Sequence, residues 1–303
     1  MDERNYWLAF AVFSGVGPKR FKLLLEKFGT AEKAWKAGKP ELAEVLKTKF
    51  TEYFLDFRSK FIISDYLREL KKHKVEFIPQ IDKNYPTLLK QIPTPPIGLF
   101  VKGNFEVLQE QTTIGIVGTR RISDYGRQVT ELFTQELVSA GFVIISGLAM
   151  GVDACVHQIT LDQKGKTIAV LGCGVDCCYP RENERLYDEI IEKGGLIVSE
   201  FPLSMQPSIG SFPSRNRIIA GLSQAVLVTE GAEDSGALIT AQDAFAIDRP
   251  VFAVPGQITS SLSKGPLNLL QQGGKMATSA NDILRELQIT NVQLPMKKIK
   301  QIL

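Results

Sequence analysis

Two short segments of the chain combine arginine with glycine, serine or asparagine. Gly118–Arg121 ends an apolar run, and Ser214–Arg217 opens a segment of helical character. Guanidinium groups beside the backbone N–H groups of a helix start bind phosphate oxygens, so both segments predict a site for a phosphate that stays bound. Alternatively, one arginine of the second segment pairs with Glu200 or Glu230 to brace the structure, because buried charges need partners.

Two further segments offer hydrogen-bond donors of the same kind. Tyr179–Asn183 follows a Gly-Cys-Gly turn, and Ser235–Thr240 follows Glu230. The second would open a helix whose first N–H groups lack partners within the helix and could hold an anion. An ordinary capped helix start is the alternative interpretation.

Residue patterns for catalysis are missing from the sequence, which has no GxSxG elbow and no GxxxxGK[ST] loop. Asp153 and His157 stand four positions apart, and a structural hydrogen bond between them is favoured over a catalytic dyad. The four cysteines include no CxxC pair, so we expect reduced thiols and no metal. The sequence therefore predicts a binding protein that is not an enzyme and uses no cofactor.

The elements that must position these residues form an α/β pattern. From about residue 112 onward, short apolar runs alternate with helical stretches, which predicts βαβ units and a parallel sheet with helices on both faces. The carboxyl ends of parallel strands line one crevice, so the polar residues that end these runs should converge there. They are Gly118, Ser146–Gly147, Gly172, Ser199–Glu200, Thr229–Glu230 and Pro255–Gly256.

A dinucleotide is the usual ligand of such a sheet, but its fingerprint is absent. Gly115–Arg120 does not complete a GxGxxG motif. Asp124 also lies too close to be the acidic ribose partner, which is expected about 20 residues further on. We therefore do not expect a nicotinamide enzyme.

The segment before about residue 80 is helical in pattern. Ser14–Pro18 separates its first two helical runs, and its glycines permit a tight turn whose N–H groups could face a phosphate, as in helix-hairpin-helix modules. A plain helix–helix turn is the alternative. The proline-rich Ile92–Pro96 should be extended, because each proline restricts the residue before it.

Charge and hydropathy bound the function further. The net charge of +3 does not by itself identify a nucleic-acid binder, but residues 1–82 carry 16 basic and 12 acidic side chains, whereas 83–288 carry 17 and 21. No apolar stretch approaches the roughly 20 residues that span a bilayer, and the first residues do not resemble a secretory signal. These features predict a cytoplasmic protein that does not enter a membrane.

Several motifs, taken in order, resemble the DNA-processing protein A family, DprA, also called Smf. The resemblance runs from about Tyr85 to Leu287, and the Gly15–Pro18 region resembles the family's N-terminal helical domain. The motifs are VGTRR (117–121), ISGLAMGVDACVH (145–157), LGCGVDCCYPRENERLY (171–187), SEFP (199–202), FPSRNRIIAGLS (212–223), SGALITAQDA (235–244) and VPG (254–256).

This resemblance implies a recombination mediator of natural transformation that binds incoming single-stranded DNA, protects it and helps load RecA. It implies an extended Rossmann-like, mostly parallel sheet over residues 83–288, a helix-hairpin-helix (SAM-like) domain over 1–82, and a homodimer. The tail 289–303 is too short for the C-terminal winged helix that members often carry. The implied DNA contacts are Gly118, Thr119, Arg120, Ser146, Gly147, Arg181, Asn183, Arg215, Asn216, Arg217, Ser235 and Gly236, with Arg120 and Arg217 foremost.

Aromatic side chains that could stack on bases are few. Phe142, Tyr179, Phe201 and Phe212 lie near the predicted strand ends, and each is expected to belong to the core. Two alternatives to DNA binding stay open. One is an enzyme similar to the LOG-type phosphoribohydrolases, although their PGGxGTxxE loop is absent, and the other is a nucleotide sensor.

Overall fold

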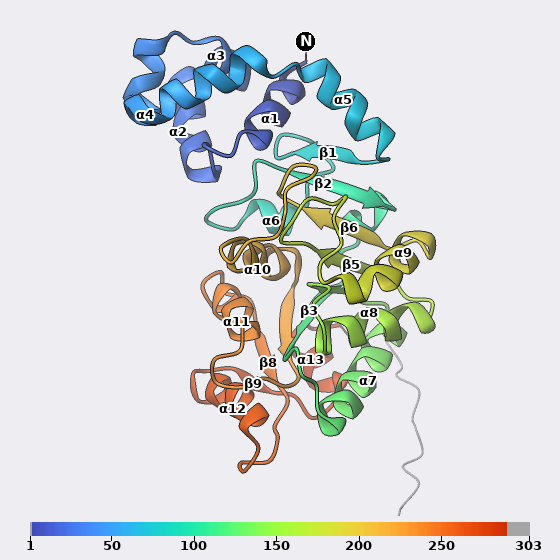
Figure 1. The fold of residues 1–303 in the computed structure, drawn as a ribbon. Coiled ribbons are helices and arrows are strands. Elements are labelled where there is room, and N and C mark those ends of the chain that lie inside the picture. The colour runs from blue at the N-terminus through green and yellow to red at the C-terminus, as the bar shows by residue number, and fades with distance from the viewer. Residues whose placement is uncertain (1, 290–303) are drawn as a thin grey trace, which may run out of the picture.

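The structure is a computed structural model that describes residues 2–289 of the chain (Figure 1). Its N-terminal part consists of helices, as the sequence predicts. Asp2 caps the first helix by accepting a hydrogen bond from the Arg4 N–H, and Thr30 caps the third in the same way through Lys33. The helices are α1 (Glu3–Val12), α2 (Pro18–Phe28), α3 (Ala31–Lys36), α4 (Lys39–Lys60) and α5 (Ile63–Lys72).

Aromatic rings form the core of this helical part. Phe10 contacts Phe21, Trp35 and Phe54, with ring centroids 5.1–5.5 Å apart. At the Ser14–Pro18 turn, the Arg20 guanidinium donates a hydrogen bond to the carbonyl oxygen of Gly15 at 2.9 Å and lies 3.8 Å from the centre of the Phe50 ring. The guanidinium of Arg20, which contacts the turn, is therefore already engaged within the helical part.

A single mostly parallel sheet follows, in the order β1-β2-β6-β5-β4-β3-β7-β8-β9. The pairings of β1 with β2 and of β2 with β6 are antiparallel, and the other pairings are parallel. This confirms the predicted fold class. The strands are β1 (Glu76–Pro79), β2 (Gly98–Gly103), β3 (Thr113–Val117), β4 (Val143–Ser146), β5 (Thr167–Val170), β6 (Leu196–Ser199), β7 (Ala225–Val228), β8 (Val251–Ala253) and β9 (Lys275–Met276).

Helices cover both faces of the sheet (Figure 1). The covering follows from the alternation of side chains along each strand: Ile114 and Ile116 pack toward α7 and α8, whereas Val117 packs toward α10 and α11. One face carries α7 (Asp124–Ser139), α8 (Val152–Asp162), α9 (Glu184–Glu192) and α13 (Ala280–Glu286). The other face carries α6 (Thr87–Lys90), α10 (Ser211–Leu222), α11 (Ala237–Phe245) and α12 (Lys264–Gln271).

The helical part is joined to the sheet through a shared buried cluster. Leu8 of α1 and Leu70 of α5 pack with Phe100 of β2 and Ile197 of β6. Strand β1 begins at Glu76, inside the segment for which the sequence predicts helices, and pairs with β2. The division of the chain at residue 82 stays a prediction.

Strand order reverses beside β3. From β3 the chain builds β4, β5 and β6 on one side, and then crosses to build β7, β8 and β9 on the other. A crevice forms at such a reversal, outside the carboxyl ends of the two strands that flank it, which here are β3 and β7. Within residues 2–289, no helix is long and apolar enough to cross a bilayer. Most of the predicted tail, 290–303, lies outside the described residues.

Candidate nucleic-acid interface

A pocket of about 630 Å³ opens at the point where strand order reverses, and we call it the switch-point pocket. Its walls are the turn after β3, the first two turns of α10 and the segment that leads into α11. Seven of the twelve predicted contact residues line it. They are Gly118, Thr119, Arg120, Arg215, Asn216, Ser235 and Gly236.

The turn after β3 is held tightly against its neighbours. Thr119 donates its N–H to the carbonyl oxygen of Glu230 at 2.8 Å, and its hydroxyl accepts the N–H of Arg121 at 3.1 Å. A Cβ at Gly118 would lie 2.5 Å from the side chain of Val152, so only glycine fits there. The fixed turn leaves the Arg120 side chain exposed at the pocket, with its guanidinium 5.8 Å from the centre of the Phe212 ring.

The start of α7 carries its own anion, the carboxylate of Glu230. This carboxylate accepts the N–H of Ser123 at 2.9 Å and also the Ser123 hydroxyl, which in turn accepts the N–H of Gly126 at 3.0 Å. In a dinucleotide-binding sheet, the helix start after the first parallel strand holds the pyrophosphate. Here a negative side chain occupies that place, which argues against a nucleotide phosphate at α7.

The floor of the pocket is built around Arg215, which is only 5% exposed. Its guanidinium donates to the carbonyl oxygen of Val170 at 3.1 Å and lies so close to Gly147 that a Cβ there would be 1.4 Å from Nη1. The buried Asp153 accepts the N–H groups of Gly147 at 3.1 Å and Ala149 at 3.4 Å. Burial raises the pKa of Asp153, although the charge of Arg215 opposes the shift.

The predicted contacts Ser146 and Gly147 therefore support the floor and do not line the pocket. The Ser146 hydroxyl is fully buried and donates to the carbonyl oxygen of Ile116 at 2.7 Å. On the opposite wall, the Asn216 amide donates to the carbonyl oxygen of Gly236 at 3.2 Å, which ties α10 to the start of α11. The pocket is thus a hydrogen-bonded frame beside the exposed Arg120 and Arg121.

Arg217 lies away from the switch-point pocket. It forms an ion pair with Glu200 at the end of β6, and the two side chains are 18% and 11% exposed. Burial raises the pKa of Glu200, and the nearby Arg217 opposes that shift. The alternative in which one of the two arginines pairs with Glu200 is confirmed, while a DNA contact by Arg217 stays a prediction.

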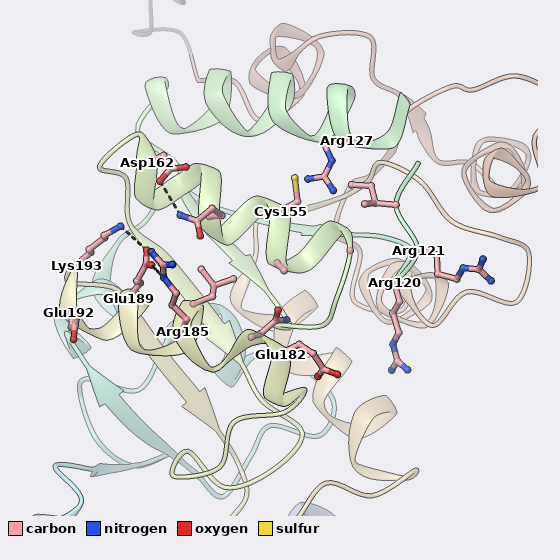
Figure 2. Close-up of a pocket in the computed structure, with 16 residues that line it drawn as sticks. Arg120, Arg121, Arg127, Cys155, Asp162, Glu182, Arg185, Glu189, Glu192 and Lys193 are labelled. Atoms are coloured by element: carbon pink, nitrogen blue, oxygen red, sulfur yellow. Dashed lines mark hydrogen bonds and ion pairs between the residues drawn. The ribbon is translucent and has the colours of Figure 1, made fainter. Parts of the chain in front are cut away.

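A second depression of about 1100 Å³ runs between α8 and α9, and we call it the helix cleft (Figure 2). The turn after β3 forms one end of it, so Arg120 and Arg121 line both the helix cleft and the switch-point pocket. Asn183 lines the helix cleft and donates its amide to the carbonyl oxygen of Leu148 at 2.9 Å. Arg181, in the short 3-10 helix Arg181–Asn183, is exposed beside it.

Asp153 and His157 do not bond to each other, so the predicted hydrogen bond between them is wrong. His157 is fully buried, and its Nδ1 lies 2.7 Å from the Thr167 hydroxyl, which itself donates to the carbonyl oxygen of Ile144. Nδ1 therefore carries the proton and donates it to Thr167. Within residues 2–289, no group of three or more histidine, cysteine or acidic residues is placed to hold a metal.

Comparison with known proteins matches the chain to a family. The family model for DNA recombination-mediator protein A covers residues 76–288. The chain belongs to this DNA recombination-mediator protein A family. It is 42% identical to protein Smf of Synechocystis over 291 residues, which are 94% of this chain and 73% of that protein. It is 44% identical to DNA processing protein DprA of Bacillus subtilis, over 75% of this chain and 76% of the relative.

Two solved structures of DNA processing protein A resemble this member of the family. The protein from Streptococcus pneumoniae superposes with a TM-score of 0.80 at 34% identity, covering 93% of this chain and 97% of that one. The protein from Helicobacter pylori, whose structure concerns its single-stranded DNA binding mode, gives a TM-score of 0.63 at 29% identity over 71% and 96% of the two chains.

Two aromatic residues of this family member were misjudged from the sequence. Tyr179 and Phe212 line the switch-point pocket, with ring centroids 5.5 Å apart, and Tyr179 is 45% exposed, so neither is a core residue. Phe142 is buried in the core, as predicted. Ile209, which lines the same pocket and is 93% exposed, was missed because a lone aliphatic residue in a loop carries no sequence signal.

Proposed function

We propose that this protein binds single-stranded DNA in the switch-point pocket and acts as a recombination mediator of natural transformation. The observation that carries the proposal is the pairing, in one pocket, of an exposed guanidinium with two aromatic rings. Arg120 supplies the cation, and Tyr179 and Phe212 supply the rings. A phosphate and its neighbouring base need these two kinds of group side by side.

The preference for a single strand follows from the rings. Stacking on an aromatic side chain is worth about 1–3 kcal/mol per base, but a base can stack only when it is not paired within a duplex. The charge contact is different, because phosphates of single and double strands are equally charged. Tyr179 and Phe212 should therefore supply the discrimination, and Arg120 the salt-dependent affinity.

We further propose that the protein binds without turnover and without a cofactor. Of the titratable groups nearest the floor, the Asp153 carboxylate is bound by two N–H groups, and burial lowers the pKa of His157 to about 3, so this imidazole stays neutral. Burial also raises the pKa of the Cys155 thiol in the helix cleft. None of these groups is set up as a nucleophile or general base.

The partners we propose are RecA and a second copy of the chain, in the cytoplasm. Membership of a recombination-mediator family supports RecA as the protein that receives the strand. The described sheet ends at β9, whose second edge pairs with no strand among residues 2–289 and whose Met276 is 58% exposed, which supports contact with another copy. A monomer mass in solution at micromolar concentration would count against the homodimer.

The test of the function is fluorescence anisotropy of the whole chain with labelled oligothymidine and with a duplex of equal length, at two salt concentrations. Tighter and salt-sensitive binding to the single strand is expected. If neither oligonucleotide binds, the proposal fails and the two small-nucleotide alternatives are tested next: release of a base from a nucleoside monophosphate would distinguish the LOG-type enzyme from a sensor.

A further inference from the structure

The helix cleft and the switch-point pocket adjoin the same turn after β3. Arg120 and Arg121 line both, so a chain of phosphates leaving the pocket over this turn enters the cleft directly. Figure 2 shows these two arginines on the turn at one end of the cleft, and Arg185 and Glu189 of α9 with Lys193 directly after α9 at the other. One end of the cleft thus adjoins the switch-point pocket, and the other end lies at α9.

Charge divides the cleft in the same way. At the end near the turn, Arg120, Arg121 and Arg127 are exposed, and within residues 2–289 none of them forms an ion pair. At the α9 end, both cations are paired with one carboxylate: Arg185 lies 2.9 Å and Lys193 2.8 Å from Glu189.

Further carboxylates make the α9 end net acidic. Asp162 and Glu192 also line the cleft there, so with Glu189 three carboxylates stand against the two cations, while Glu182 lies between the two ends (Figure 2). On α7, Glu131 follows Arg127 by one helical turn and acts on Cys155 electrostatically, as Arg127 does. An anion is therefore attracted to the end near the turn and repelled beyond it.

We propose that the helix cleft is a second binding segment for the same DNA strand, and that Arg127 binds a phosphate of the nucleotides that leave the switch-point pocket. The acidic α9 end stops the strand there, so the site has a defined length. This inference rests on the proposed function, because it extends the same bound strand. It assigns Arg127 and Arg121 to the DNA path.

The first test is a ladder of oligothymidines, about 4 to 16 nucleotides long, bound to the wild type and to Arg127→Ala. Short oligomers fill the switch-point pocket alone and should bind both proteins equally. Beyond a threshold length, Arg127→Ala should bind about five- to tenfold more weakly than the wild type. The slope of log affinity against log salt concentration should also be smaller in magnitude by about 0.7, because one phosphate contact is lost.

Arg185→Ala is the matched control, because Arg185 lines the same cleft but is 92% exposed and paired with Glu189. Arg185→Ala should bind oligothymidines of every length as tightly as the wild type does, or slightly less tightly. Equal weakening by both variants would overturn the proposal, as would a loss in Arg127→Ala that does not depend on length.

The second test uses Cys155 as a native reporter, because this partly exposed thiol lines the cleft next to Arg127. Maleimide modification of the unmodified chain, mapped by peptide mass, should be slowed at Cys155 by long oligothymidine and not by short. Cys177 lines neither depression and is the internal control: its modification rate should not change when oligothymidine binds. Modification of Cys155 at the same rate with long oligothymidine bound would overturn the proposal.

The two tests separate this inference from the proposed function. If oligothymidine of every length fails to bind the wild type, the proposed function itself is wrong. If all lengths bind with the same affinity and Cys155 stays reactive, the switch-point pocket holds the strand and the cleft does not.

Discussion

At the scale of single residues, Arg215 and Arg217 do different work although they stand two positions apart. Residues at that spacing point to different sides of a helix. Arg215 therefore lies under the switch-point pocket against Gly147, while Arg217 reaches Glu200. Arg120, on a turn and not on a helix, is the arginine of the predicted set that is both exposed and in the pocket.

Replacing Arg120 should weaken DNA binding and leave the fold intact. Its guanidinium makes no ion pair within residues 2–289, so Arg120→Ala breaks no internal salt bridge. We expect roughly tenfold lower affinity for oligothymidine and a salt slope reduced by about 0.7, measured by anisotropy. Arg120→Lys should recover part of the affinity, and full affinity in Arg120→Ala would remove this residue from the site.

Gly147→Ala should disturb the pocket floor. The added Cβ would lie 1.4 Å from Nη1 of Arg215, so the guanidinium must leave its place and its hydrogen bond to Val170. We expect a loss of about 1–3 kcal/mol in the free energy of unfolding by urea, together with weaker DNA binding. Gly210→Ala is the control, because its backbone is helical and nothing lies within 4 Å of an added Cβ.

His157 should make the protein less stable in acid. The unfolded chain takes up a proton near pH 6.5, whereas burial lowers the pKa of the folded imidazole to about 3. The contribution of the neutral His157 to the free energy of unfolding is therefore fully present above pH 6.5 and is lost as the pH falls toward 3. By pH 5 the loss is about 2 kcal/mol.

His157→Asn is the control for that pH dependence. The asparagine amide can still donate to Thr167 but does not titrate, so its urea-unfolding free energy should fall less steeply between pH 7 and pH 5. All other titratable groups are unchanged, so the difference between the two slopes belongs to His157. Parallel slopes would mean that the imidazole protonates in the folded protein.

At the scale of elements, Arg217 and Glu200 tie α10 to the end of β6. Removing one partner of a largely buried pair leaves the other charge without compensation. Arg217→Ala should therefore cost about 3 kcal/mol in urea unfolding, and the double variant Arg217→Met with Glu200→Gln should recover part of it. If stability is unchanged while DNA affinity falls, Arg217 is the DNA contact that the sequence predicts.

The six apolar runs predicted as strands are all strands in the structure, because buried parallel strands are continuous runs of Val, Ile and Leu. β1, β2 and β9 were not predicted. β2 begins directly after the proline-rich connection, and β9 has only two residues, both exposed. β1 and β9 are edge strands, whose pairing is decided by tertiary contacts, whereas β2 lies between β1 and β6 and its buried run Leu99–Val101 was missed.

The candidate site was predictable where strand order determines position. Residues at the ends of β3 and β7 converge because the sheet reverses there, and the sequence identified them without a structure. The role of each side chain was not predictable, since it depends on rotation within α10 and on close approaches such as that of Arg215 to Gly147. Tyr179 and Phe212 were misjudged for the same reason.

At the scale of the whole molecule, the helical part and the sheet share buried contacts through Leu8, Leu70 and Phe100. We therefore expect one cooperative unfolding transition. Both tryptophans, Trp7 and Trp35, lie in the helical part, so tryptophan fluorescence reports on that part alone, whereas far-ultraviolet circular dichroism reports on both. Coincident urea transitions by the two probes are the expected result, and separate midpoints would show two independent units.

The carboxylate of Glu230 at the start of α7 has one more consequence. Many sheets of this architecture hold a nucleotide at that place. Binding and hydrolysis of that nucleotide can switch the affinity of the protein for a second ligand. Here the carboxylate of Glu230 occupies that place, so the start of α7 offers no site for such a nucleotide switch. Release of a bound strand would then depend on its own dissociation rate and on competitors for the same strand, and not on nucleotide turnover.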